Sequence, residues 1–127
     1  NYIYQWNEMR LQHALYYSKL LSSIQQIQTP LIRPEAKHIF HVYAIRAQQR
    51  DELQKFLHSH QIETAIHYPT PLPLLPAYKY LNYKPSDVPI AANYQNQILS
   101  LPMFPELTKE QIHYVVDTIK SFYAKNN

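Results

Sequence analysis

Seven histidines are the side chains of this sequence with the widest chemical use, as metal ligands, bases or proton donors. His58 and His60 stand two apart on a predicted helix, so their side chains point about 200° apart. His38 and His41 stand three apart on a predicted strand and therefore lie on opposite faces. Neither pair can hold one ion without distortion, and the spacing predicts no metal site.

Serines and carboxylates form no catalytic group by spacing. The sequence contains no glycine, which excludes a nucleophile elbow, a P-loop and a dinucleotide fingerprint. It also contains no cysteine, which excludes disulfides, thiolate metal sites and a cysteine nucleophile. Asp51 and Glu52 are adjacent carboxylates, but they stand at a predicted helix start, where the helix dipole accounts for them. We therefore expect no catalytic residue in this chain.

The segment His67-Tyr68-Pro69-Thr70-Pro71 is the strongest candidate for ligand contact. A histidine and a tyrosine close a predicted strand, and prolines fix the extended loop that follows. Strand ends that open into rigid loops often carry binding residues. The two side chains could equally satisfy local backbone groups beside a proline turn, and spacing alone leaves both interpretations open.

The pattern of apolar residues predicts the elements that position this segment. Helices are expected over residues 6–27, 49–60 and 88–97, and after Thr108, which forms a capping box with Gln111. Strands are expected over residues 38–47, covered on both faces, and over 62–68 and 98–101. Eight prolines between residues 69 and 105 predict turns and short helical pieces. The fold class is α+β: a two-layer small domain with about three strands and helices packed mainly on one face.

Size and charge narrow the class of partner. A chain of 127 residues holds one domain, and a start at Asn1 predicts a piece of a longer protein. The net charge is +3, but the twelve Lys and Arg residues form no basic run, which disfavours nucleic acid. No signal peptide and no run of about 18 apolar residues is present. We expect no nucleic-acid or membrane partner, and a cytoplasmic location by default.

Several short motifs stand in a distinctive order along the chain. They are Trp6-Asn7 with Arg10, Ala14, Tyr17 and Leu21; His41-Val42-Tyr43 through Arg46, then Arg50-Asp51-Glu52-Leu53; His67-Tyr68-Pro69; and Leu99-Ser100-Leu101-Pro102-Met103-Phe104-Pro105 before Leu107-Thr108. Each motif is short, but together, in this order and spacing, they resemble one family over nearly the whole chain. That family is the DegT/DnrJ/StrS group of pyridoxal-phosphate aminotransferases that act on nucleotide-linked keto sugars.

The resemblance implies that residues 1–127 are a C-terminal small domain that closes over the nucleotide-sugar. The large domain, whose lysine holds pyridoxal phosphate, would lie outside this chain. The full-length protein would be a homodimeric enzyme that uses glutamate as amino donor. The resemblance favours His67 and Tyr68 as substrate contacts for positioning and specificity. We expect that the fragment alone neither binds the cofactor tightly nor transaminates.

Five positions depart from the family pattern. Pro73 and Leu75 replace a usual His and Gln, Ala92 replaces a common Glu, and Gln61 and Asn82 occupy usual glycine positions. A glutamine at such a position predicts backbone strain or a shifted turn. The replacements favour altered substrate preference over a paralogue that has lost transamination. A non-catalytic protein-interaction module is the second candidate function, and a small RNA-binding domain is the third.

Overall fold

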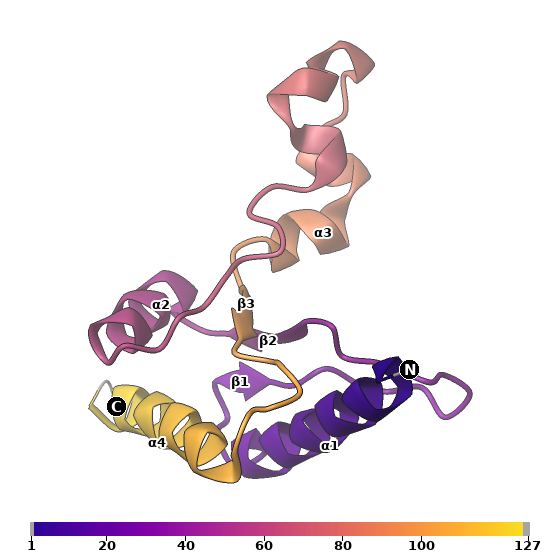
Figure 1. Ribbon diagram of the computed structural model, residues 1–127. Helices are drawn as coiled ribbons and strands as arrows, with labels where there is room; N and C mark the ends of the chain where they lie inside the picture. The colour runs from indigo at the N-terminus through magenta and orange to yellow at the C-terminus, as the bar shows by residue number, and fades with distance from the viewer. Residues whose placement is uncertain (1, 126–127) are drawn as a thin grey trace.

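A computed structural model describes residues 2–125 as a three-stranded sheet, a layer of helices and a projecting arm (Figure 1). The strands are β1 (Ile27–Gln28), β2 (Tyr43–Ala47) and β3 (Ile98–Leu101), antiparallel and in the order β1-β2-β3. The long helices are α1 (Ile3–Leu21), α2 (Arg50–Ser59) and α4 (Lys109–Lys125). Helix α4 packs against both α1 and α2.

The sheet directs its large apolar side chains towards the helices. Tyr43 pairs with Leu101 and Ile45 with Leu99, so the four side chains share one face, and all four are buried. They join the buried residues of α1, α2 and α4 in a single core cluster. The predicted α+β fold with helices mainly on one face is confirmed.

Two tyrosines stack in this core and differ in what their hydroxyls bind. The ring centroids of Tyr17 and Tyr43 lie 5.1 Å apart. The Tyr43 hydroxyl lies 2.8 Å from Ser18 Oγ, whereas the buried Tyr17 hydroxyl has no hydrogen-bond partner among residues 2–125. Burial raises the pKa of Tyr17 and raises the pKa of Tyr43 to about 12, so both phenols are neutral at physiological pH.

We expect Tyr17→Phe to raise the free energy of unfolding by about 1 kcal/mol, because it removes an unpaired buried hydroxyl. Tyr43→Phe should lower it by about 1 kcal/mol, because Ser18 then loses its partner. Urea unfolding followed by circular dichroism measures both variants. Equal losses in the two variants would show that the Tyr17 hydroxyl is hydrogen-bonded after all.

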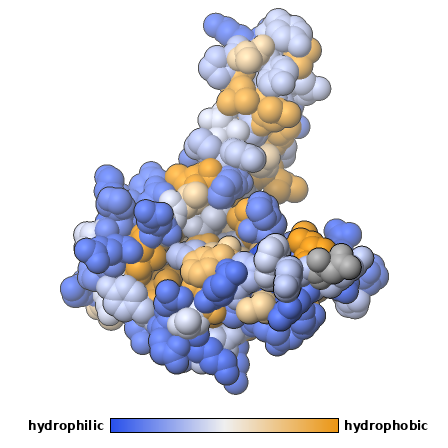
Figure 2. All heavy atoms as spheres, in the orientation of Figure 1, coloured by the Kyte–Doolittle hydropathy of each residue, from blue (hydrophilic) through white to orange (hydrophobic). Residues whose placement is uncertain are grey.

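Residues 68–97, here called the arm, project from the body away from α1 and α4 (Figure 1). The arm contains three short 3₁₀ helices, η1 (Leu72–Leu74), η2 (Pro76–Leu81) and η3 (Pro85–Asp87), and helix α3 (Pro89–Tyr94). None of its residues is buried, and Figure 2 shows hydrophobic residues along it. Turns and short helical pieces were predicted from the prolines of this region, and they are confirmed.

The first helix was predicted to run over residues 6–27, and both predicted ends are wrong. Helix α1 begins at Ile3 and ends at Leu21, and residues 22–28 turn back to form β1 beside β2. Ser22 Oγ donates to the carbonyl of Lys19 at 2.8 Å, a contact that competes with helix continuation. The spacing of apolar residues placed the end of this helix too late, because Ile24 packs in the same core although it lies in the turn after α1.

The strand predicted over residues 38–47 forms only from Tyr43, and its second face is only partly covered. Phe40 has a φ of 46°, a left-handed conformation that interrupts regular strand pairing. Residues along β2 alternate between buried and half-buried, so cover is complete on one face and partial on the other. Helix 49–60 is confirmed within one residue at each end, as α2. The predicted strand 98–101 is confirmed with its bounds. The helix predicted over 88–97 is shorter, as α3.

The last helix is confirmed with its cap. Thr108 N donates to Gln111 Oε1 at 2.9 Å, and Gln111 N donates to Thr108 Oγ1 at 3.2 Å, which completes the predicted capping box. The predicted core stripe of α4 is buried at each position: Ile112, Val115, Val116, Ile119 and Phe122.

The strand predicted over residues 62–68 is absent, and a single bridge joins Ala65 to Ser100. On one side of the bridge, the next pairing of the ladder would need an N–H from Pro102, which has none. On the other side, the guanidinium of Arg50 lies against the carbonyl of Ile98 and occupies the place where a pairing strand would bond. The sheet therefore takes its third strand from β1 and leaves residues 62–67 as an irregular edge beside β3.

Candidate functional site

A cavity of about 800 Å³ opens between this irregular edge, the segment after β3 and the start of α4. Its apolar wall includes Ile62, Leu101 and Met103, and its polar groups include the side chains of His67 and Glu110. Hydrogen bonds from its own backbone amide and from Thr108 lower the pKa of Glu110, which keeps this exposed carboxyl ionised at neutral pH. Apolar walls with a few polar groups are typical of small-ligand sites.

The two predicted contact residues lie in different surroundings. His67 lines the cavity, and its Nδ1 lies 2.9 Å from the Oγ of Ser100. Tyr68 does not line the cavity and is 74% exposed at the start of the arm. The two rings meet edge to face, with centroids 5.6 Å apart. The structure thus brings His67 to a concave surface and leaves Tyr68 on its outer side.

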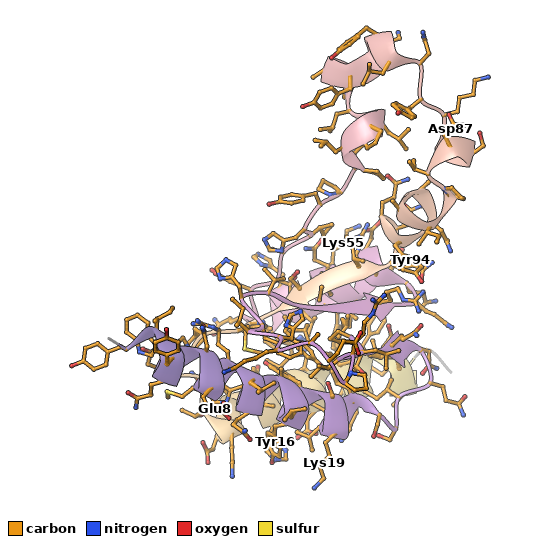
Figure 3. The ribbon with its side chains drawn as sticks, turned by 90° about the vertical axis from the view of Figure 1, so that its right-hand side faces the viewer. Glu8, Tyr16, Lys19, Lys55, Asp87 and Tyr94 are labelled. Carbon is orange, nitrogen blue, oxygen red and sulfur yellow. The ribbon has the colours of Figure 1, made fainter. Side chains whose placement is uncertain are left out.

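Two arginines of the body contact the C-terminal end of the arm. Arg50 is only 7% exposed, and its Nη1 donates to the carbonyls of Ile98 at 2.8 Å and Gln95 at 3.2 Å. Its Nε donates to Asp51 at 2.6 Å. The guanidinium of Arg46 lies 4.2 Å from the ring centroid of Tyr94, which Figure 3 labels where the arm meets the body. Gln95 and Tyr94 are the arm residues among these contacts, so the two arginines join the C-terminal end of the arm to the body.

The departures from the family pattern divide between arm and cavity. Pro73, Leu75 and Ala92 lie on the arm, and none of them lines the cavity. Gln61 lines the cavity with a φ of 60°, and Asn82 ends η2 with a φ of 56°. Both usual glycine positions therefore keep the left-handed conformation. For glutamine this conformation costs about 1 kcal/mol.

The residues of this chain do not fit pyridoxal phosphate. The cofactor needs a lysine amine placed in a protected site, and all eight lysines are exposed. No lysine or arginine lines the cavity. Within residues 2–125, no three His, Asp or Glu side chains form a group that could hold a metal ion.

Comparison with known proteins agrees with this architecture. The sequence profile of the DegT/DnrJ/EryC1/StrS aminotransferase family matches residues 1–120. This chain belongs to that family. A dTDP-3-amino-3,4,6-trideoxy-alpha-D-glucose transaminase of Streptomyces venezuelae is 32% identical over 92% of the chain. A pleiotropic regulatory protein of Geobacillus stearothermophilus is 45% identical over 94% of the chain.

Among solved structures, DesV of S. venezuelae, in complex with a ketimine intermediate, superposes with a TM-score of 0.90 and 31% identity. The match covers 95% of this chain but 33% of DesV. The chain likewise covers 32% of the Geobacillus protein and 31% of the Streptomyces transaminase. It therefore spans about a third of the length of these members of the DegT/DnrJ/EryC1/StrS family.

Sequence reasoning gave no role to Ser100 or Arg50. Both had been quoted only as parts of family motifs, although each carried a signal. Ser100 is the one polar residue of the apolar strand Ile-Leu-Ser-Leu, and a polar group in a buried strand needs a partner. Arg50 stands on the helix face that also carries Leu53 and Leu57, where a buried charge needs acceptors.

Proposed function

We propose that residues 1–127 are the C-terminal domain of a pyridoxal-phosphate-dependent aminotransferase that acts on nucleotide-linked keto sugars. The observation that carries the proposal is the match to DesV, at 31% identity and a TM-score of 0.90 over 95% of the chain. The relatives named above include a transaminase of a dTDP-linked sugar, and a UDP-linked sugar aminotransferase of Acidithiobacillus ferrooxidans is 31% identical. Glutamate as the amino donor is part of the same proposal.

The role of this domain is to cover and position the substrate. The cofactor lysine is proposed to come from outside residues 1–127, which is supported by the match of this chain to only a third of DesV. Glu63 and Glu110 are the charged carboxylates of the cavity, and no Lys or Arg lines it. This charge disfavours the diphosphate of a nucleotide-sugar. We place the uncharged sugar at the cavity, with His67 as its contact and Tyr68 as a second contact from the arm.

The arm is expected to be covered in the full-length protein. It exposes large apolar and aromatic side chains, among them Tyr68, Leu72, Tyr80 and Ile90. Exposed apolar side chains that gather on one surface are unfavourable in water and often mark a contact with another domain or chain. We propose that the large domain and a second subunit of a homodimer cover them. A cytoplasmic location stays a prediction, and no helix within residues 2–125 has the length and hydropathy to cross a membrane.

The exposed arm also favours the second candidate function, a protein-interaction module. Tyrosines and leucines on a projecting, proline-fixed segment suit contact with another protein. The two candidates differ in chemistry, because the module would bind a heterologous partner without any need for a nucleotide-sugar. A full-length protein that binds neither cofactor nor nucleotide-sugar would favour the module.

The test of the proposed function is turnover by the full-length protein. We expect glutamate-dependent conversion of a dTDP- or UDP-linked keto sugar to the amino sugar, detected by mass spectrometry of the nucleotide-sugar. Pro73→His with Leu75→Gln should leave the reaction in place, because neither residue lines the cavity, and should change keto-sugar preference only through the arm that carries the Tyr68 contact. Turnover only in this double variant would instead identify a paralogue that has lost transamination.

A further inference from the structure

Ser100 is a buried polar residue that is bonded through its backbone to Ala65 and through its side chain to His67. It is 5% exposed, and its backbone N–H and carbonyl both bond to Ala65, at 2.7 and 3.2 Å. Its neighbours Leu99 and Leu101 face the helical core, so its own side chain faces the opposite side of the sheet. There its Oγ meets Nδ1 of His67 at 2.9 Å.

The other ring nitrogen of His67, Nε2, is the one left for a ligand. Ser100 is the hydrogen-bond partner of this ring among residues 2–125, and the ring itself lines the cavity. The edge-to-face contact with Tyr68 limits rotation of the ring from its exposed side. The hydrogen bond made by one imidazole nitrogen decides the protonation and the direction of the other.

The buried position of Ser100 also decides which group donates. A hydroxyl has one hydrogen to place, and His67 Nδ1 is the acceptor that the structure offers it. If Nδ1 donated instead, the Ser100 hydroxyl would have no acceptor among the described residues, which is unfavourable for a side chain only 5% exposed. An imidazole that accepts at Nδ1 carries its hydrogen at Nε2, on the other edge of a ring that lines the cavity.

We propose that Ser100 is the positioning residue of His67, which it holds as an Nε2–H donor to an oxygen of the sugar. This inference rests on the proposed function for the identity of the ligand. Ser100 also lines the cavity, but its hydroxyl is bonded to His67 Nδ1, and its proposed effect on the ligand passes through that ring. The ligand group it selects is an acceptor, such as a hydroxyl or carbonyl oxygen.

The test is a double-mutant cycle in the full-length enzyme, with KM for the nucleotide-linked keto sugar as the readout. We expect Ser100→Ala to raise this KM about three- to tenfold, the value of one neutral hydrogen bond. Ser100→Thr keeps the hydroxyl and should retain most of the affinity. In a His67→Ala background, Ser100→Ala should add less than about twofold, because its effect passes through the missing ring. Ser121→Ala, at an exposed serine of α4, is the matched control.

An unchanged KM in Ser100→Ala, or the same loss with and without His67, would overturn the positioning role. A second measurement separates this from failure of the proposed function. Ring ¹⁵N chemical shifts of His67 in the full-length protein, assigned by His67→Gln, should report the Nε2–H form and should change in Ser100→Ala. Unchanged shifts overturn the proposal even if the enzyme turns over. Changed shifts with an unaltered KM in His67→Ala would support the hold of Ser100 on the ring but would overturn the contact between His67 and the sugar.

Discussion

Replacing Arg50 by alanine is expected to lower the free energy of unfolding by about 3 kcal/mol and to loosen the arm. The guanidinium is buried and donates to the carbonyls of Gln95 and Ile98, which the alanine would leave without their donor. The Asp51 carboxylate is exposed, so its loss of a partner adds little. Urea unfolding measures the first effect, and amide hydrogen exchange over residues 89–98 measures the second.

Two further variants define what Arg50 does. Arg50→Lys keeps the charge but loses the planar group that reaches two carbonyls, so about half of the loss is expected. Arg33→Ala, at an exposed arginine, should change stability by less than about 0.5 kcal/mol. A loss in Arg50→Ala no larger than in Arg33→Ala would show that the buried contacts do not hold the arm.

The second large effect is expected on activity. In the full-length enzyme, His67→Ala should lower kcat/KM for the nucleotide-linked keto sugar about tenfold or more, because a positioned hydrogen-bond donor is lost. Tyr68→Phe should cost less, because the Tyr68 side chain is 74% exposed and does not line the cavity. Steady-state kinetics with the keto sugar varied at saturating glutamate measure both.

The matched control for this comparison is His58→Ala, at an exposed histidine of α2 that does not line the cavity. It should leave kcat/KM unchanged within about twofold. Circular dichroism of the three variants checks that each is folded. If His67→Ala behaved like His58→Ala, His67 would not contact the substrate.

Local patterns in the sequence predicted the elements that have local causes. The capping box at Thr108 and the apolar stripe of α4 lie within one helix, and both are confirmed. The strand Ile98–Leu101 was recognisable because a short apolar run precedes a proline. Prolines likewise predicted the irregular arm.

The wrong predictions concern segments whose backbone conformation depends on contacts with residues distant in the sequence. Apolar spacing could not separate the end of α1 from β1, since both reach the same core. The edge at residues 62–67 depends on Pro102 and Arg50, whose positions beside it are set by the sheet register. Left-handed residues such as Phe40 and Gln49 leave no mark in the pattern, because both residue types are uncommon there.

Only one of the two residues at the candidate site was predicted from the sequence, because the other is brought to it by a contact distant in the sequence. His67 stood out as a histidine before a proline-fixed loop. Its partner Ser100 lies 33 residues further along the chain and meets it only through the bridge between Ala65 and Ser100. The cavity was not predictable, since the residues that line it come from segments that are distant in the sequence.

The most direct measurement for the whole account is the visible absorption spectrum of the full-length protein, before and after borohydride reduction and on addition of glutamate. The account predicts a cofactor band that glutamate changes, that a nucleotide-linked keto sugar restores, and that reduction fixes to a lysine outside residues 1–127. A protein that stays colourless when pyridoxal phosphate is supplied would contradict the account.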